Sequence, residues 1–162
     1  LKSTNRDNII GIQSQIWSET IRNENILDYM FMPNIIVFSQ KAWSKDPKWM
    51  SIQDQTEREI TLNYEWNKFT NSIGQRVLPI VENIYGGLTY DLPKPGGIIK
   101  NDSLYANTAF PGLNIKYTLD GSLPNIESMN YNNPVKIDQD DVISLRLFDN
   151  NGRGGYPIQV DK

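Results

Sequence analysis

The chain has 162 residues, a net charge of −3, no cysteine and no histidine. This length suits one medium domain or two small ones, and the nearly balanced charge gives no electrostatic footprint for nucleic acid. The missing residue types exclude disulfides, thiolate nucleophiles and histidine-based dyads. No apolar run approaches the roughly 18 residues of a membrane span. We therefore expect no cofactor and no metal, and chemistry limited to carboxylates, amides, hydroxyls and aromatic rings.

The first predicted element is a strand over residues 9–16, which carries four isoleucines around Gly11. Such a run is typical of a strand buried on both faces in a parallel sheet. Trp17 and Glu19 follow it directly, and an aromatic ring beside a carboxylate suits a sugar, which offers C–H groups and hydroxyls. A parallel strand needs neighbours on both edges, and the chain offers no other strand–helix–strand unit. Either those neighbours precede Leu1, which we favour, or the strand pairs in a non-parallel way.

Helical patterns fill the next part of the chain. Apolar residues from Ile26 to Trp43 predict a helix that Pro33 kinks or restarts. A second amphipathic stripe runs from residue 62 to residue 84, with interruptions expected near Gly74 and Pro79. The remaining tryptophans of this part are predicted to pack in the core or between domains: Trp43, Trp49 and Trp66.

The pattern changes near residue 93. Residues 93–97 are rich in proline and glycine and predict a rigid linker. Alternating apolar residues over 113–119 and 143–147 predict strands, and a last short strand is expected at 158–160. Turn sequences follow two of these strands, at 120–122 and 150–152. The pattern predicts a small antiparallel β-sandwich and two domains, residues 1–92 and 93–162.

Six short motifs carry a resemblance to a known family, at residues 11–19, 27–33, 41–44, 90–96, 107–113 and 115–122. The first three resemble the end of the catalytic barrel of family 20 glycoside hydrolases, the β-N-acetylhexosaminidases and chitobiases, whose last barrel strand carries a Trp-x-Glu element. The last three resemble the C-terminal domain of the bacterial members. The resemblance implies an α+β chain: the last strand and helices of a (β/α)8 barrel, followed by a small Ig-like antiparallel β-sandwich.

The resemblance also implies an activity, the exo-acting removal of terminal N-acetylhexosamine by substrate-assisted, retaining hydrolysis. In the family the 2-acetamido oxygen attacks its own anomeric carbon, a Glu protonates the leaving oxygen and a neighbouring Asp orients the acetamide. This chain contains no Asp-Glu dipeptide, so we expect no catalytic residue in it and no activity from it alone. By matching position, Trp17 would form a wall of the sugar pocket and Glu19 would bind hydroxyls around O4 and O6.

The implied partners are an N-acetylglucosamine-containing oligosaccharide and the remainder of the catalytic barrel upstream of Leu1, with no nucleic acid and no membrane span. The implied location is the periplasm, the cell surface or the medium. The chain departs from the family at Asn34 and Asp91, where the family has Arg, and at Gln40, where it has Glu. Two of these replacements remove charges that in the family tie the helix and the junction together.

The alternative is a non-catalytic β-sandwich module that binds carbohydrate or protein. Such a module usually exposes several aromatic residues on one face. All four tryptophans precede residue 93, and Tyr117 is predicted to lie on the buried side of its strand. We therefore favour an accessory scaffold over a sugar-binding domain. The aspartates at 138, 140 and 141 lack EF-hand spacing and predict a solvated loop.

Overall fold

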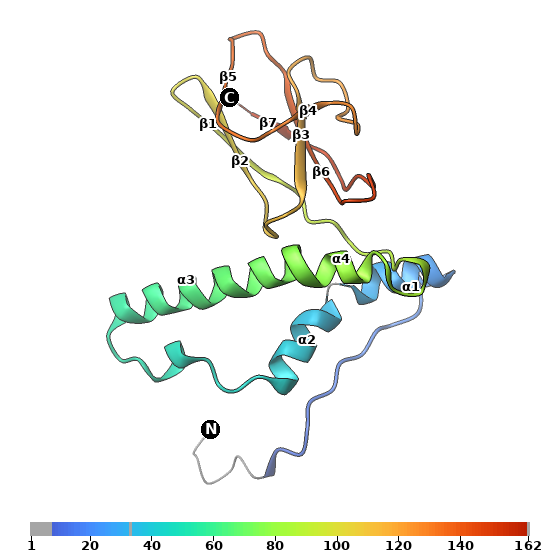
Figure 1. The fold of residues 1–162 in the computed structure, drawn as a ribbon, viewed down its shortest axis with the longest axis vertical. Helices are drawn as coiled ribbons and strands as arrows, with labels where there is room; N and C mark the ends of the chain where they lie inside the picture. Colours follow the sequence, from blue (N-terminus) through green and yellow to red (C-terminus); the bar gives the residue numbers. More distant parts are fainter. Residues whose placement is uncertain (1–7, 33, 162) are drawn as a thin grey trace.

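The structure, a computed structural model, describes residues 8–32 and 34–161. Helices occupy the first half of the chain and antiparallel strands the second, so the fold is mixed. Figure 1 shows the long helical rod lying between the β-sheets and the N-terminal segment. We call residues 24–86 the helical region and residues 96–160 the β region.

The helical region contains two short helices and one long interrupted rod. The elements are α1 (Glu24–Phe31), α2 (Asn34–Trp43), a 3-10 turn (Lys48–Ser51), α3 (Gln55–Ser72), a π-helical turn (Ile73–Val77), α4 (Leu78–Val81) and a last 3-10 turn (Ile84–Gly86). Side-chain caps define two of the starts. The Asn23 and Asp54 side chains accept hydrogen bonds from the backbone N–H groups of Ile26 and Glu57, at 2.9 and 2.8 Å.

Two of the predicted helix breaks are confirmed, whereas the chain stays helical at Pro79, inside α4. α1 ends at Phe31 and α2 begins at Asn34, whereas Pro33, on which that prediction rested, lies outside the described residues. The interruption expected near Gly74 is the π-helical turn, in which the backbone widens without ending the rod. The rod therefore continues through the π-helical turn into α4, which packs against the β region.

The strand predicted over residues 9–16 is absent, which is a correction. This segment has no regular secondary structure, and its isoleucines are exposed, Ile10 completely. The reason is physical: an apolar strand becomes stable only when neighbouring strands take up its N–H and C=O groups, and no described segment pairs with it. The segment has the apolar composition of a buried strand, but no described strand lies beside it.

Two antiparallel sheets make up the β region. The first has the order β1 (Gly96–Lys100), β2 (Ser103–Asn107), β5 (Val135–Lys136); the second has the order β4 (Met129–Asn130), β3 (Asn114–Thr118), β6 (Ile143–Phe148), β7 (Ile158–Val160). The strands predicted near 113–119, 143–147 and 158–160 are confirmed as β3, β6 and β7. The predicted linker is wrong at its end, because Gly96 and Gly97 belong to β1 and pair with Asn107 and Ala106.

One continuous apolar core joins both sheets to the end of the helical rod. Its members include Leu104 and Leu145 from the two sheets and Leu78 and Val81 from α4. Tyr117 is buried, as predicted. Because the core crosses from helix to sheet, the rod is a packed layer of the same hydrophobic unit as the β region.

The rod closely approaches the loop between β2 and β3 at two glycines. A Cβ atom on Gly74 would lie 2.0 Å from the carbonyl oxygen of Pro111, and one on Gly112 would lie 3.2 Å from the carbonyl oxygen of Gly74. Gly112 also has φ of +106°, a backbone conformation that favours glycine. The two missing side chains allow helix backbone and loop backbone to touch directly.

The core placement predicted for the tryptophans is wrong for two of them. Trp43 is 90 % exposed and Trp66 is 57 % exposed, whereas Trp49 is half-buried. Trp43 is the last residue of α2, and Trp66 lies on α3, where it contacts Phe69 with ring centroids 6.0 Å apart. Within the described residues, neither ring belongs to the apolar core that joins the rod to the β region.

Candidate functional site

The predicted sugar-binding pair lies on the extended segment before α1. Trp17 is 73 % exposed, and Glu19 is exposed in a turn that the Ile21 N–H to Ser18 C=O hydrogen bond closes at 3.1 Å. Within the described residues, neither side chain has a hydrogen bond or a ring contact. A weak contact of the Thr20 hydroxyl with the Met30 sulfur, at 3.9 Å, ties the turn to α1. The structure leaves the pair open and brings no third functional group to it.

A buried polar cluster joins the end of the helical rod to the β region. The Tyr90 hydroxyl donates to Glu82 Oε1 at 2.6 Å, and the Asn150 amide donates to Glu82 Oε2 at 3.3 Å. Arg153 donates through Nε to Asp149 Oδ2 at 2.9 Å and through Nη1 to the Tyr90 carbonyl. We call these five residues, Glu82, Tyr90, Asp149, Asn150 and Arg153, the junction clasp.

The clasp satisfies two carboxylates that would otherwise be costly to bury. Glu82 and Asp149 are both buried, and Asp149 also accepts from the backbone N–H groups of Asn151 and Arg153. The Arg153 guanidinium carbon lies 4.5 Å from the centre of the Tyr90 ring, a cation–π arrangement. Burial, with the neighbouring Glu82 carboxylate, raises the pKa of Tyr90 and keeps its phenol protonated as a donor.

Two of the three departures from the family pattern lie near this junction. The Asp91 N–H donates to the Met32 carbonyl at 3.5 Å, and the Asn34 amide donates to the Met30 carbonyl at 3.2 Å. Burial and a hydrogen bond with Asp91 raise the pKa of Tyr29 to about 12. In this chain a tyrosine therefore meets the carboxylate at the position where the family has Arg. Gln40 lies apart from them and lines an open hollow with Trp43.

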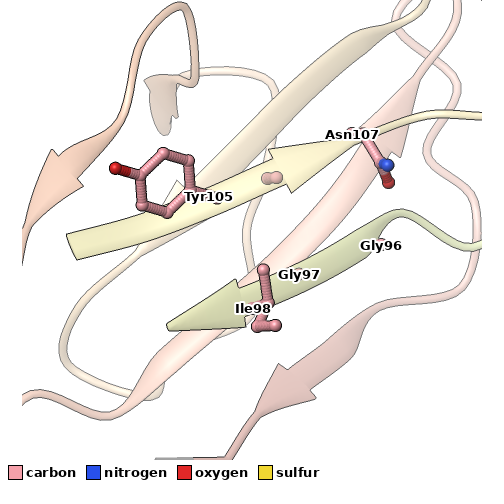
Figure 2. Close-up of a pocket in the computed structure, with 6 residues that line it drawn as sticks. Gly96, Gly97, Ile98, Tyr105 and Asn107 are labelled. Carbon is pink, nitrogen blue, oxygen red and sulfur yellow. The ribbon is translucent and has the colours of Figure 1, made fainter. Parts of the chain in front are cut away.

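A third feature lies on the β region. A hollow of about 380 Å³ lies over β1 and β2 and is lined by Gly96, Gly97, Ile98, Tyr105, Ala106 and Asn107. Figure 2 shows the two strands with the labelled lining residues. Ile98 faces Tyr105 across the strand pair, and Gly96 faces Asn107. Directly opposite residues project to the same side of a sheet, so these four share its outer face. The alternate residue Leu104 is fully buried on the inner face.

The sugar-binding role predicted from the sequence for Trp17 and Glu19 stays a prediction, and the sequence did not predict the clasp or this hollow. The signal for the hollow was present in residues 103–107, where Tyr105 alternates with the apolar Leu104 and Ala106. The clasp had no local signal, because its members come from three separate segments. No group of three or more His, Cys, Asp or Glu side chains within residues 8–32 and 34–161 is placed to hold a metal ion. Among the helices described, none has the length and apolar character needed to cross a bilayer.

Comparison with known families gives two matches along the chain. Residues 1–46 match the glycosyl hydrolase family 20 catalytic domain, and residues 82–155 match the chitobiase/beta-hexosaminidase C-terminal domain. The chain therefore belongs to glycoside hydrolase family 20, in its chitobiase and β-hexosaminidase branch.

Two bacterial relatives support this assignment. The chain is 34 % identical over 120 residues to the N,N'-diacetylchitobiase of Vibrio harveyi, an alignment that covers 68 % of the chain and 13 % of the relative. It is 30 % identical over 167 aligned positions to the beta-hexosaminidase of Vibrio vulnificus, covering 93 % of the chain and 19 % of that protein. The chain thus spans less than a fifth of the length of the curated relatives that it matches.

Proposed function

We propose that this chain is the C-terminal part of an exo-acting β-N-acetylhexosaminidase, which removes terminal N-acetylhexosamine from chitooligosaccharides or glycans. One observation carries the proposal: part of a catalytic domain and a C-terminal domain of the same enzyme class follow one another in this chain. The reaction is the substrate-assisted, retaining hydrolysis that the family resemblance implies. The chain itself has no Asp-Glu pair and is inactive alone.

The same proposal accounts for the open N-terminal half. Residues 9–16 form the last strand of a (β/α)8 barrel once the upstream strands are beside them, and α1 and α2 cover that strand from outside. The exposure of the isoleucines and of Trp43 supports this, because barrel elements bury their apolar faces against neighbours on both sides. The two sheets of the β region form an Ig-like sandwich that braces the barrel through the junction clasp.

Within the completed barrel, Trp17 and Glu19 belong to the sugar pocket. Active sites of such barrels lie at the carboxyl ends of the strands, and the pair follows residues 9–16 directly. The indole of Trp17 packs on the apolar face of the terminal sugar, and the Glu19 carboxylate accepts hydrogen bonds from its hydroxyls around O4 and O6. The protein works in the periplasm, at the cell surface or in the medium, where chitooligosaccharides are available.

The experiment compares the complete reading frame that contains this chain with the chain alone, using a chromogenic N-acetylglucosaminide. We expect hydrolysis by the longer protein and none by the chain. In the longer protein, Glu19→Gln lowers kcat/KM by about tenfold to a hundredfold, because a lost charge-assisted hydrogen bond costs about 1.5–3 kcal/mol. The matched control is Glu24→Gln, in the exposed first turn of α1. Hydrolysis by the purified chain, or an unchanged kcat/KM in Glu19→Gln, contradicts the proposal.

A further inference from the structure

We propose that the hollow over β1 and β2 binds an oligosaccharide of β-1,4-linked N-acetylhexosamine, through Tyr105, Ile98 and Asn107. The preference for an N-acetylated sugar rests on the proposed function, whereas a sugar of some kind is favoured by the chemistry of the hollow itself. The hollow combines an apolar surface with a polar group, and its size limits the affinity.

The apolar part is the pair formed by Tyr105 and Ile98. They face each other across β1 and β2 and are 42 % and 55 % exposed. The next outward-facing row of the same sheet is polar, with Lys100 opposite Ser103 and Ser103 opposite Lys136. An aromatic ring with a polar tip, beside an aliphatic side chain, offers a flat apolar surface to the C–H face of a sugar ring and a hydroxyl to its edge.

The polar part is the carboxamide of Asn107. A Cβ atom on Gly96 would lie 2.3 Å from Asn107 Oδ1, so the amide lies across the glycine in space that any side chain would fill. Within the described residues the amide makes no hydrogen bond, and it can both donate and accept. An acetamido group offers the complementary acceptor and donor. Figure 2 shows Asn107 and Tyr105 along the same strand, with Ile98 on the neighbouring one.

The size of the hollow sets the affinity. Its volume of about 380 Å³ lies at the lower end of the range for small-molecule sites. The site is a shallow face over two strands of the three-stranded sheet, so a bound sugar keeps much of its surface in water. We therefore expect weak binding, with a Kd on the order of 1 mM. The lysines of the polar row, Lys100 and Lys136, are exposed and provide donors to hydroxyls of a sugar that extends past Tyr105.

The test uses the 162-residue chain itself, labelled with nitrogen-15 and titrated with chitotetraose. We expect the amide resonances of Ile98, Tyr105 and Asn107 to shift together. Tyr105→Ala should raise Kd at least about tenfold, which corresponds to about 1.4 kcal/mol. Tyr64→Ala is the matched control, because Tyr64 is 68 % exposed on α3, outside the hollow. Tyr105→Phe keeps the ring and should retain most of the binding.

Two further measurements test the role of the Asn107 carboxamide. Gly96→Ala should push the Asn107 carboxamide off the strand and weaken binding severalfold. Cellotetraose, which has the same linkage without acetamido groups, should bind about tenfold more weakly than chitotetraose, if the amide recognises the acetamido group. Far-UV circular dichroism and Tm establish that each variant is folded before its Kd is interpreted.

Three results would overturn the inference. They are unchanged binding by folded Tyr105→Ala, equal binding of the two sugars, and resonance shifts confined to Trp17 and Glu19. None of them touches the proposed function, which is decided by hydrolysis in the longer protein. Conversely, the longer protein could fail to hydrolyse the N-acetylglucosaminide while the Tyr105 resonance of the chain shifts with chitotetraose. That result would support the binding site and contradict the proposed activity.

Discussion

The two halves of the molecule differ in how far their apolar side chains are buried. In the β region, Leu104, Leu145 and Leu147 are fully buried between sheets that the same region supplies. α1 and α2 are also rich in apolar residues, yet neither contains a single buried one. The difference lies in the surroundings and not in the composition, since the β region provides both faces of its own core.

This contrast indicates which parts of the chain depend on others. A pair of packed sheets closes its own core, whereas a helix or strand taken from a layered fold exposes the face that its neighbours covered. The long rod is intermediate, because α4 and the π-helical turn are packed on the sheets while much of α3 is exposed. The part of the chain that is packed on the β region therefore begins within the rod, near residue 70, and most of the part before it lacks such packing.

The largest effect that tests this contrast is a core deletion. Leu145→Ala should lower the free energy of unfolding by roughly 2–5 kcal/mol, because a fully buried leucine leaves a cavity between the sheets. Ile60→Ala, on a residue of α3 that is 65 % exposed, is the control and should change it by less than about 0.5 kcal/mol. Urea unfolding measures both. Equal losses would show that α3 is as well packed as the sheets.

The second test concerns the contact between rod and sheets. Gly74→Ala should cost roughly 3 kcal/mol, since its Cβ meets the Pro111 carbonyl oxygen, which cannot move without displacing backbone. Gly11→Ala is the matched control, because nothing lies within 4 Å of a Cβ there. Thermal unfolding followed by circular dichroism compares the two. A gain in stability at Gly74, as in an exposed helix, would mean that the rod is not held against the loop.

The smallest effect is expected at the junction clasp. Arg153→Met should lower stability by about 2 kcal/mol, because it leaves the buried Asp149 carboxylate without its charged partner. Arg58→Met, on an exposed residue of α3, serves as the control. Amide hydrogen exchange adds the decisive detail, since protection should fall in residues 78–92 as well as in the β region. A loss confined to the 149–153 turn would restrict the clasp to a local role.

The sequence predicted the elements whose apolar residues follow a simple period. In β3 and β6 every second residue is apolar and buried, although the polar Lys116 and Ser144 between them are buried as well. The amphipathic stripe of the rod matches the helix period. β1 and β2 escaped detection because Gly96 and Gly97 resemble a linker and the strands are short. The signal was the turn between them, where Asn101 and Asp102 both adopt positive φ, as a two-residue hairpin requires.

The errors have a common cause. The strand at residues 9–16 and the core placement of Trp43 were both inferred from apolar composition, which reports the environment a residue needs and not the one available. Trp17 and Glu19 were predicted as a site because their chemistry is local in sequence, and that role stays a prediction. The clasp was not, because Glu82 and Arg153 are far apart in the chain and meet only after the rod has docked on the sheets.

The paired glycines at 74 and 112 have an evolutionary consequence. A side chain at 74 would enter the space of the Pro111 backbone, next to Gly112, and a side chain at 112 would approach the backbone of Gly74, so neither position can change freely while the other backbone stays in place. Across related chains, the two positions should therefore covary. A larger residue at 74 should occur with a longer or displaced loop around 112, and the spacing between rod and sheets should differ in those proteins.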